Sequence, residues 1–320
     1  MARKRRGQPV HGWVNIDKTL GKTSTQAVGI VRRAFDAQKA GHGGTLDPLA
    51  TGVLPIALGE ATKTIPFVMD GAKSYRFTVR WGEATDTDDG EGEVIATSDQ
   101  RPDRTAIEAV LSRFTGTIDQ VPPRYSAIKI DGQRAYDLAR ADKAVEMTAR
   151  EVRVDKLSLI ATPDSNHAEF ALDCGKGTYV RSLARDIAVA LGTVGSVSAL
   201  RRTRSGPFTD CDAISLAKFE QTRHMSAQDG SEGLPPPIDF ANFLHPVVSA
   251  LDDIPALNVT ESEAARLRHG QPVPVLRTDN CQQIDGLTDD ADLCALLDGE
   301  VIALLRLKGR MAQPVRVLNL

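Results

Sequence analysis

GHGGTLDPLATGVLP, residues 41–55, is the most distinctive stretch of the chain. It places four glycines and two prolines around a single carboxylate, that of Asp47. Glycine and proline at this density specify the shape of the backbone rather than an apolar face, so we interpret the stretch as a loop that presents Asp47. The alternative is that Asp47 caps a helix, because an Asp followed by Pro is a common helix start.

The common phosphate-binding loops do not account for this region. No GxGxxG motif follows a predicted strand. The segment Gly21-Lys22-Thr23 fails the GxxxxGK[ST] pattern, because Ile16 stands where the first glycine is required. A different chemistry must therefore explain the loop.

With GEATK at residues 59–63, the stretch resembles the nucleophile motif of the TruB family, the tRNA uridine-55 pseudouridine synthases. Three more motifs of that family are similar here: KTLG at 18–21, where the family usually has Lys-Pro-x-Gly, PPRYSAIK at 122–129, and GTYVR at 177–181. The resemblance covers roughly residues 10–210. It implies an α+β pseudouridine synthase fold with a mostly antiparallel central sheet, RNA lying across a cleft, and Asp47 as the essential catalytic group.

Composition indicates a soluble globular protein. The 320 residues are 41% hydrophobic and 25% charged, and the length suits one large and one small domain. Polar residues follow the basic stretch 3–6, which excludes a signal peptide, and no apolar window is long enough to span a membrane. We therefore expect no membrane partner. The four cysteines have neither zinc spacing nor a disulfide pattern, so we expect no metal site and a cytoplasmic location.

The net charge of −3 hides an uneven distribution. Residues 1–80 hold 13 Lys and Arg against 5 Asp and Glu, whereas residues 81–100 hold 7 acids and no base. A local basic face can neutralise phosphates even on an acidic protein. An ordinary solvated surface is the alternative, and charge alone favours it.

Residue spacing predicts the main helices and strands. Thr23 and Gln26 form a capping box for a helix that begins near Ser24. Thr178 is the expected N-cap of a helix that ends at Gly192. The remaining elements are strands at 12–18, 73–81, 152–160 and 168–174 and helices at 103–114 and 261–268.

Residues 85–92, TDTDDGEG, resemble a calcium-binding loop but fail its template. Gly90 occupies the fifth position, which needs Asp or Asn, and no Glu follows at the twelfth. We therefore expect a solvated hairpin turn.

Several residues gain a role from the resemblance. Alternation alone makes Tyr75 a core residue of its strand, whereas the matching tyrosine of the family stacks on the target base. Arg181 falls in the first turn of its helix, where a cation opposes the dipole and needs an anionic partner, and an exposed arginine is the alternative. The resemblance pairs Arg181 with Asp47. It also implies substrate-binding roles for His42, Tyr179, Leu200, Lys18 and Lys129.

Basic and aromatic side chains interleave over residues 122–140, as they do in segments that bind RNA. A solvated helix face explains Arg134 and Arg140 equally well, but the resemblance implies an RNA-gripping insertion at about residues 122–151. The three arginines within residues 201–204 suit contact with phosphates.

The resemblance also implies two domains. Residues 1–250 form the catalytic domain, and residues 251–320 resemble a small C-terminal RNA-binding β domain of the PUA type. Residues 226–237 are rich in Gly, Pro, Ser and acids, which is typical of a loop or linker. The acidic balance after residue 210 argues against strong phosphate binding by the C-terminal part.

The implied function is that of an isomerase acting on uridine 55 in the T stem-loop of tRNA, as a monomer and without a metal, nucleotide or redox cofactor. The bond from ribose C1′ to uracil N1 must break, and C5 must replace N1, after the base is flipped out. Asp47 can attack the base at C6, attack C1′ or abstract a sugar proton. Arg181 would keep Asp47 ionised and oriented, and Tyr75 would stack on the base and assist removal of the C5 proton.

Two other classes of protein are alternatives. A non-catalytic RNA-binding or RNA-folding protein could share the scaffold, but it would not need Asp47, Tyr75 and Arg181 together. A glycosidase normally uses two catalytic carboxylates, and residues 41–55 offer one.

Overall fold

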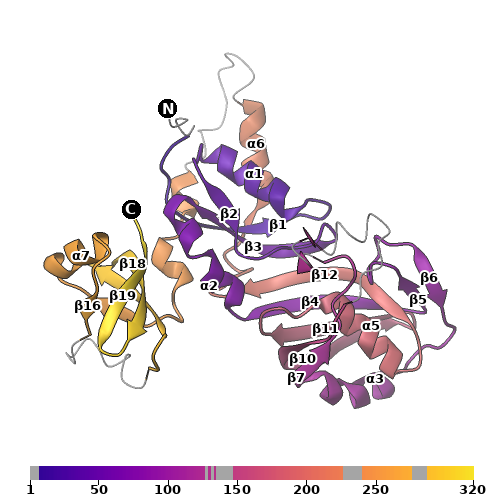
Figure 1. The fold of residues 1–320 in the computed structure, drawn as a ribbon. Coiled ribbons are helices and arrows are strands. Elements are labelled where there is room, and N and C mark those ends of the chain that lie inside the picture. The colour runs from indigo at the N-terminus through magenta and orange to yellow at the C-terminus, as the bar shows by residue number, and fades with distance from the viewer. Residues whose placement is uncertain (1–6, 127–128, 131–132, 135–146, 226–239, 276–286) are drawn as a thin grey trace.

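The computed structural model describes residues 7–126, 129–130, 133–134, 147–225, 240–275 and 287–320. Its largest element is a ten-stranded sheet with the order β14-β1-β3-β12-β4-β11-β10-β7, in which β2 also pairs with β3 and β13 with β12 (Figure 1). The strands are β1 (Gly12–Lys18), β2 (Ala40–His42), β3 (Ala50–Leu58), β4 (Lys73–Trp81), β7 (Gly116–Gln120), β10 (Arg150–Asp164), β11 (His167–Cys174), β12 (Gly195–Ser205), β13 (Phe208–Thr209) and β14 (Ile214–Ser215). Among these described strands, the pairs β1–β14 and β3–β12 are parallel and the others antiparallel. The predicted α+β class with a mostly antiparallel central sheet is therefore confirmed.

Helices lie around this sheet, and the described residues also form two small hairpins. The helices are α1 (Ser24–Ala34), α2 (Ile65–Asp70), α3 (Arg104–Val110), α5 (Val180–Ala190) and α6 (Leu216–Met225), with 3-10 turns η1 (Gly59–Lys63), η2 (Leu111–Phe114), η3 (Phe240–Phe243) and η4 (Val247–Ala250). The hairpins pair β5 (Glu83–Thr85) with β6 (Val94–Thr97) and β8 (Lys129–Ile130) with β9 (Gln133–Arg134).

Local sequence signals place the first elements as predicted. Helix α1 begins with the capping box, in which Gln26 N–H donates to Thr23 Oγ1 (3.1 Å) and Thr23 N–H donates to Gln26 Oε1 (2.8 Å). Strand β4 alternates, with Phe77, Val79 and Trp81 buried and Arg76 and Arg80 exposed. The helix predicted at 103–114 is confirmed as α3, which tightens into the 3-10 turn η2.

The predicted start of α5 is wrong by one residue. Tyr179, not Thr178, is its N-cap, and the Thr178 hydroxyl instead donates to Gly175 O (3.2 Å). The reason is a side chain from β7: Gln120 Oε1 accepts from Tyr179 N–H (2.8 Å), and Gln120 Nε2 donates to Tyr179 O (3.1 Å). This two-way contact binds the backbone N–H and C=O of Tyr179, the residue that directly precedes the helix.

The loop that carries Asp47 lies between two parts of the hydrophobic core. Leu46 is buried in the core that packs α1 and α6 against β1 and β3. Leu49 packs against the core formed by α5 with β4, β10, β11 and β12. Leu200 of β12 contacts both cores. Asp47 therefore lies between the core that contains α1 and α6 and the core that contains α5.

A second, five-stranded sheet forms the C-terminal part, in the order β15-β17-β18-β19-β16. Its strands are β15 (Ala256–Asn258), β16 (Val273–Pro274), β17 (Asp292–Leu297), β18 (Glu300–Lys308) and β19 (Met311–Val317), and helix α7 (Glu261–Arg268) packs on it. This confirms the predicted small C-terminal β unit (Figure 1).

The two sheets share buried contacts. Trp13 and Val53 of the main sheet belong to one core cluster with Leu304 and Leu318 of the C-terminal part. Lys63 Nζ also donates to Val317 O at 2.7 Å. The C-terminal sheet is therefore packed against the main body rather than tethered to it. Within the described residues, no helix combines the length and the apolarity that a membrane crossing requires.

Candidate active site

The glycine-rich stretch does not lead into a helix. Gly43 N–H donates to Pro55 O at 2.8 Å, which closes the loop, and after Asp47 a short turn runs directly into β3 at Ala50. Gly43 is tightly enclosed, because a Cβ at this position would lie 2.7 Å from Val68 Cγ1. The helix-capping alternative for Asp47 is therefore wrong, and the Asp47 side chain, 38% exposed, is presented by the loop.

Lys18 holds this loop in place rather than facing a substrate. Its side chain is fully buried, and its Nζ donates to the carbonyls of Thr19 (3.0 Å), Lys22 (2.7 Å) and Pro48 (3.3 Å). All three donors of the ammonium group are thus used on the backbone. The geometry contradicts direct substrate binding by Lys18. The neighbouring turn also contacts α6, because Lys22 pairs with Glu220 at 3.0 Å.

Two buried lysines, Lys18 and Lys73, should make the free energy of unfolding change with pH in the alkaline range. Like Lys18, Lys73 is buried and donates to backbone carbonyls, those of Val68, Met69 and Gly71 near the end of α2. Burial lowers the pKa of each lysine from 10.5 to about 8. The folded state therefore releases these protons at a lower pH than the unfolded state does. The free energy of unfolding should rise between about pH 8 and pH 10.5, by up to about 3 kcal/mol per lysine.

Urea titrations at both ends of that pH window measure the effect. Wild type should gain stability as the pH rises, and Lys73→Met should gain less, because it has lost one of the two groups. An equal gain in the two proteins would contradict the assignment to Lys73.

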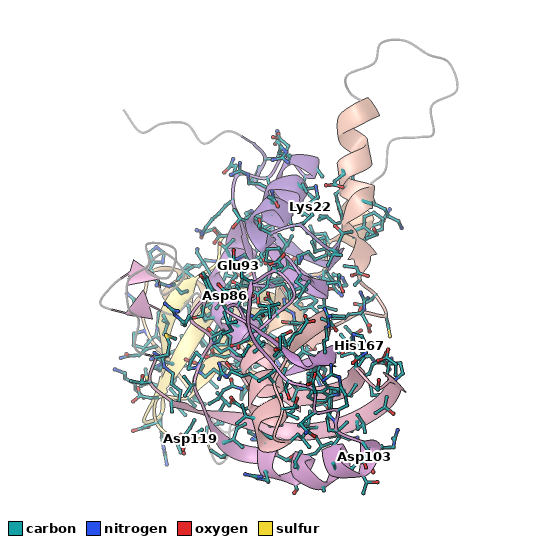
Figure 2. The ribbon with its side chains drawn as sticks, turned by 90° about the vertical axis from the view of Figure 1, so that its right-hand side faces the viewer. Lys22, Asp86, Glu93, Asp103, Asp119 and His167 are labelled. Atoms are coloured by element: carbon teal, nitrogen blue, oxygen red, sulfur yellow. The ribbon has the colours of Figure 1, made fainter. Side chains whose placement is uncertain are left out.

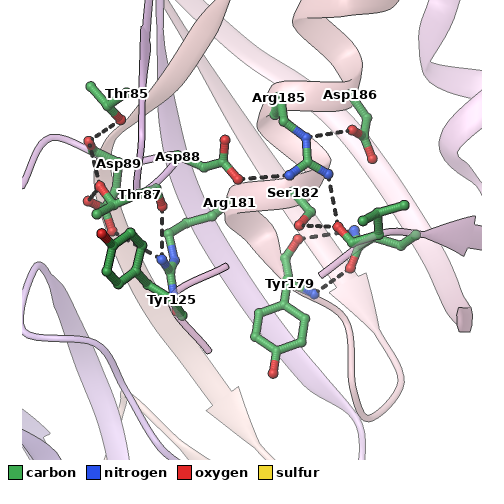
Figure 3. Close-up of polar contacts among 12 residues, drawn as sticks. Thr85, Thr87, Asp88, Asp89, Tyr125, Tyr179, Arg181, Ser182, Arg185 and Asp186 are labelled. Atoms are coloured by element: carbon green, nitrogen blue, oxygen red, sulfur yellow. Dashed lines mark hydrogen bonds and ion pairs between the residues drawn. The ribbon is translucent and has the colours of Figure 1, made fainter. Parts of the chain in front are cut away.

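Arg181 connects the exposed Asp47 to the protein interior. Its Nη2 lies 2.9 Å from Asp47 Oδ2. Its guanidinium also donates to the carbonyls of Thr87 and Tyr125, both at 2.9 Å (Figure 3). The Arg181 side chain is 7% exposed. The anionic partner predicted for a cation in the first turn of α5 is therefore present, and the alternative of an exposed arginine is wrong.

A second carboxylate, that of Asp89, shares the Arg181 guanidinium and was missed by the sequence analysis. Asp89 Oδ2 lies 3.6 Å from Arg181 Nη1, and its side chain is 4% exposed. Thr87 Oγ1 donates to Asp89 Oδ1 at 2.6 Å. Next to it, Asp88 has a positive φ of 61° and pairs with Arg185 of α5 at 2.8 Å. The expected solvated turn is therefore wrong in one respect: the hairpin is present, but these two acids face the arginines of α5 (Figure 3).

Strand pairing brings other predicted residues to this place. Tyr75 of β4 lies opposite Arg202 of β12, and Leu200 lies two residues earlier on the same face of β12. Leu200 also pairs in parallel with Ala50 of β3, three residues after Asp47. Tyr179 is the residue before α5 and thus lies two residues from Arg181. The sheet and α5 therefore gather these side chains from four separate segments.

Burial keeps the aromatic groups of the site neutral. It raises the pKa of the Tyr75 and Tyr179 phenols above 10.0 and lowers the pKa of His42 below 6.5. Gly44 N–H donates to His42 Nδ1 at 3.4 Å, so the neutral ring carries its hydrogen on Nε2. The site thus combines neutral polar groups with a carboxylate and guanidinium pair.

The three arginines near the end of β12 do not form the expected phosphate-binding cluster. Arg201 pairs with Asp17 through two N–O contacts of 3.0 Å, Arg202 is 1% exposed, and Arg204 donates to Gly206 O at 2.9 Å. Successive residues of a strand point to opposite faces of the sheet, which separates their side chains.

Part of the predicted RNA-binding region lies outside the described residues. Lys129 belongs to β8, whose side chains are not described. The same holds for residues 135–146 of the expected insertion, which include Arg140, and for the linker at 226–237. Their roles stay predictions.

Two family models match the chain. TruB family pseudouridylate synthase (N-terminal domain) matches residues 32–180, and tRNA pseudouridylate synthase B C-terminal domain matches residues 181–252. The chain belongs to the TruB family of pseudouridylate synthases. Asp47, Tyr75 and Tyr179 fall within the first TruB match, and Arg181 opens the second.

Curated TruB relatives match along the whole chain. The tRNA pseudouridine synthase B of Rhodospirillum rubrum is 52% identical over 320 residues, and the match covers 100% of this chain and 100% of the relative. That of Bradyrhizobium diazoefficiens is 53% identical over 317 residues, which cover 99% of this chain and 88% of the relative.

Solved structures share the fold. A chain of a Cbf5-Nop10-Gar1 complex is 26% identical, with a TM-score of 0.71, and the match covers 96% of this chain and 84% of that one. A chain of the archaeal box H/ACA sRNP Nop10-Cbf5 complex has a TM-score of 0.70 over 99% of this chain and 92% of that one, at 24% identity. The pseudouridine synthase fold implied by the sequence is confirmed.

Proposed function

We propose that this chain is a tRNA pseudouridine synthase that isomerises uridine 55 in the T stem-loop of tRNA. The ion pair between Asp47 and Arg181, at 2.9 Å, carries the proposal, because it fixes an accessible carboxylate beside a group of neutral aromatic side chains. Membership of the TruB family supports the reaction. The names of the curated relatives support tRNA as the substrate.

The reaction rearranges bonds without any net change in composition. The bond between C1′ and N1 breaks, the uracil ring turns over, and a bond between C1′ and C5 forms. The hydrogen on C5 leaves to water, and N1 gains a proton. Asp47 starts the reaction by attack on C1′, by attack on C6 or by removal of a sugar proton. Arg181 orients it in each case.

The remaining residues recognise the flipped nucleotide. Tyr75 stacks on the target base and assists removal of the C5 proton, and Leu200 supplies apolar contact beside it. His42 donates a hydrogen bond through Nε2, and Tyr179 closes the site at the start of α5. Lys129 binds the RNA from the insertion at about residues 122–151.

One chain supplies Asp47, Tyr75 and Arg181, which supports a monomeric enzyme. The described cysteines Cys174, Cys211 and Cys294 are free, which supports a reducing cytoplasm. Residues 1–250 would form the catalytic domain, and residues 251–320 a small PUA-like domain.

The two alternatives have less support. Family membership and the Asp47–Arg181 pair favour an enzyme over a non-catalytic RNA-binding protein. A glycosidase needs a second carboxylate that reaches the substrate. Asp89 is the second carboxylate on Arg181, but at 4% exposure it is shielded from a substrate.

Site-specific mapping tests the substrate. An unmodified tRNA transcript is incubated with the protein, and pseudouridine is located by carbodiimide labelling and primer extension. We expect one modified position, uridine 55, and none in a transcript with cytidine there. Modification at other uridines with position 55 untouched would contradict the proposed substrate.

Asp89→Asn should lower kcat about tenfold while the protein stays folded. The amide keeps the shape of the side chain and can still accept from Thr87, but it removes one of the two charges that hold Arg181. If the weaker hold on Arg181 raises the activation free energy by about 1.4 kcal/mol, the rate falls tenfold. Single-turnover rates measure the effect.

Glu93→Gln is the matched control, since Glu93 is exposed on the same hairpin and undergoes the same change of charge (Figure 2). Its rate should equal that of wild type. Equal rates for Asp89→Asn and Glu93→Gln would contradict a role for Asp89.

A further inference from the structure

Arg202 is a buried cation whose partners are backbone carbonyls. Its side chain is 1% exposed, and its guanidinium donates through Nε to Val53 O (2.8 Å), through Nη1 to Thr45 O (3.3 Å) and through Nη2 to Gly44 O (3.0 Å). Within the described part of the chain, no carboxylate forms an ion pair with it. Burying a charge without a counter-charge is costly, so this arrangement calls for a functional explanation.

The carbonyls identify what Arg202 holds. Gly44 and Thr45 lie three and two residues before Asp47 on the nucleophile loop, and Val53 lies on β3 just after that loop. All three nitrogens of the guanidinium are used, so the loop is fixed to β12 on both sides of Asp47. A Cβ added at Gly44 would lie 3.5 Å from Arg202 Nη1, which is an ordinary van der Waals distance, so the guanidinium occupies the space directly beside this glycine.

Arg202 also faces the residue proposed to stack on the base. Tyr75 is its direct cross-strand partner on β4. Both residues lie on the face of the sheet that carries Leu200. One guanidinium thus contacts the loop of Asp47 and the strand position of Tyr75.

We propose that Arg202 is a positioning residue for the reaction, which fixes the loop of Asp47 relative to Tyr75 through its three-way contact with backbone carbonyls. The inference rests on the proposed function. Arg202 does not touch the substrate and acts through Asp47 and Tyr75. Arg202 uses three separate nitrogens for these carbonyls, whereas a lysine offers one, so we expect the planar fork to be required.

Chemical rescue of Arg202→Ala tests the proposal. The substrate is a T-arm RNA with tritium on C5 of its uridine, and release of tritium is followed at saturating RNA. A misplacement of about 1 Å costs about 100-fold in rate, so we expect kcat to fall by about that factor while KM changes much less. Millimolar guanidinium should restore kcat in a saturable way, because it fills the cavity with the missing fork. Urea has the same planar shape without the charge and should not restore it.

Controls separate positioning from stability. Arg80→Ala removes an exposed arginine from the same sheet, where it pairs with Glu83 at 2.7 Å, and should keep the wild-type kcat with or without guanidinium. Arg202→Lys keeps a charge and should stay folded by urea titration with kcat still reduced at least tenfold. It replaces Arg202→Ala as the test if the latter does not fold.

Three outcomes would overturn the proposal. The first is a kcat of the folded variant within about threefold of wild type. The second is equal rescue by guanidinium and urea, and the third is a fall in kcat that the fraction of unfolded protein accounts for completely. Absence of tritium release by wild type would instead refute the proposed function itself. The two failures are therefore distinguishable.

Discussion

Arg181→Met is expected to lower kcat about 100- to 1,000-fold and to reduce the free energy of unfolding by about 3–5 kcal/mol. The activity is lost because Asp47 loses the group that orients it at 2.9 Å. Stability is lost because Asp89, 4% exposed, becomes a buried charge without its cation. Single-turnover tritium release measures the first effect, and urea titration measures the second.

The double variant Arg181→Met with Asp89→Asn separates the two effects. Removing the charge of Asp89 should recover much of the lost stability, because no unpaired buried carboxylate remains. Activity should stay as low as in the single variant. Recovery of activity together with stability would contradict a direct role of Arg181 at Asp47.

Gly52→Ala is expected to destabilise the protein by about 3–5 kcal/mol. Gly52 has a φ of +98°, and a Cβ there would lie 2.1 Å from the carbonyl oxygen of Arg202. The obstacle is backbone, and Gly52 pairs with both Lys18 of β1 and Arg202 of β12. An added methyl group must therefore push two strands of the main sheet apart. Urea titration measures the loss.

Gly192→Ala is the matched control for this variant. Gly192 also has a positive φ, +72°, but a Cβ there would meet nothing within 4 Å. Its cost should be limited to backbone strain, about 1–2 kcal/mol. Equal losses in the two variants would show that close approach of β12 is not what requires glycine at position 52.

Elements with local signals could be predicted from the sequence. The capping box at Thr23 and Gln26 fixed the start of α1, and alternation fixed β4. The motifs around Asp47 and Arg181 led to the family and to the fold. The position of Arg181 in a first turn also predicted an anionic partner, since a cation there opposes the helix dipole.

Contacts between distant segments could not be predicted in the same way. Asp89 looked like part of a solvated turn, because Arg181, with which it pairs, lies about ninety residues later in the chain. Arg202 looked like a phosphate ligand, because its partners are carbonyls, which no sequence pattern marks. The N-cap of α5 depends on Gln120 of a distant strand. In each case, a contact between segments that are distant in the sequence decided the role of a polar side chain.

The most direct test of the proposed function compares wild type with Asp47→Asn in tritium release from a T-arm RNA labelled on C5 of uridine 55. Asparagine keeps the size of the side chain and removes its nucleophilic carboxylate. We predict release by wild type and none by Asp47→Asn, with RNA binding by the variant unchanged in filter assays. Release at wild-type rates by Asp47→Asn, or RNA binding without release by both proteins, would contradict the assignment of this chain as an Asp47-dependent pseudouridine synthase.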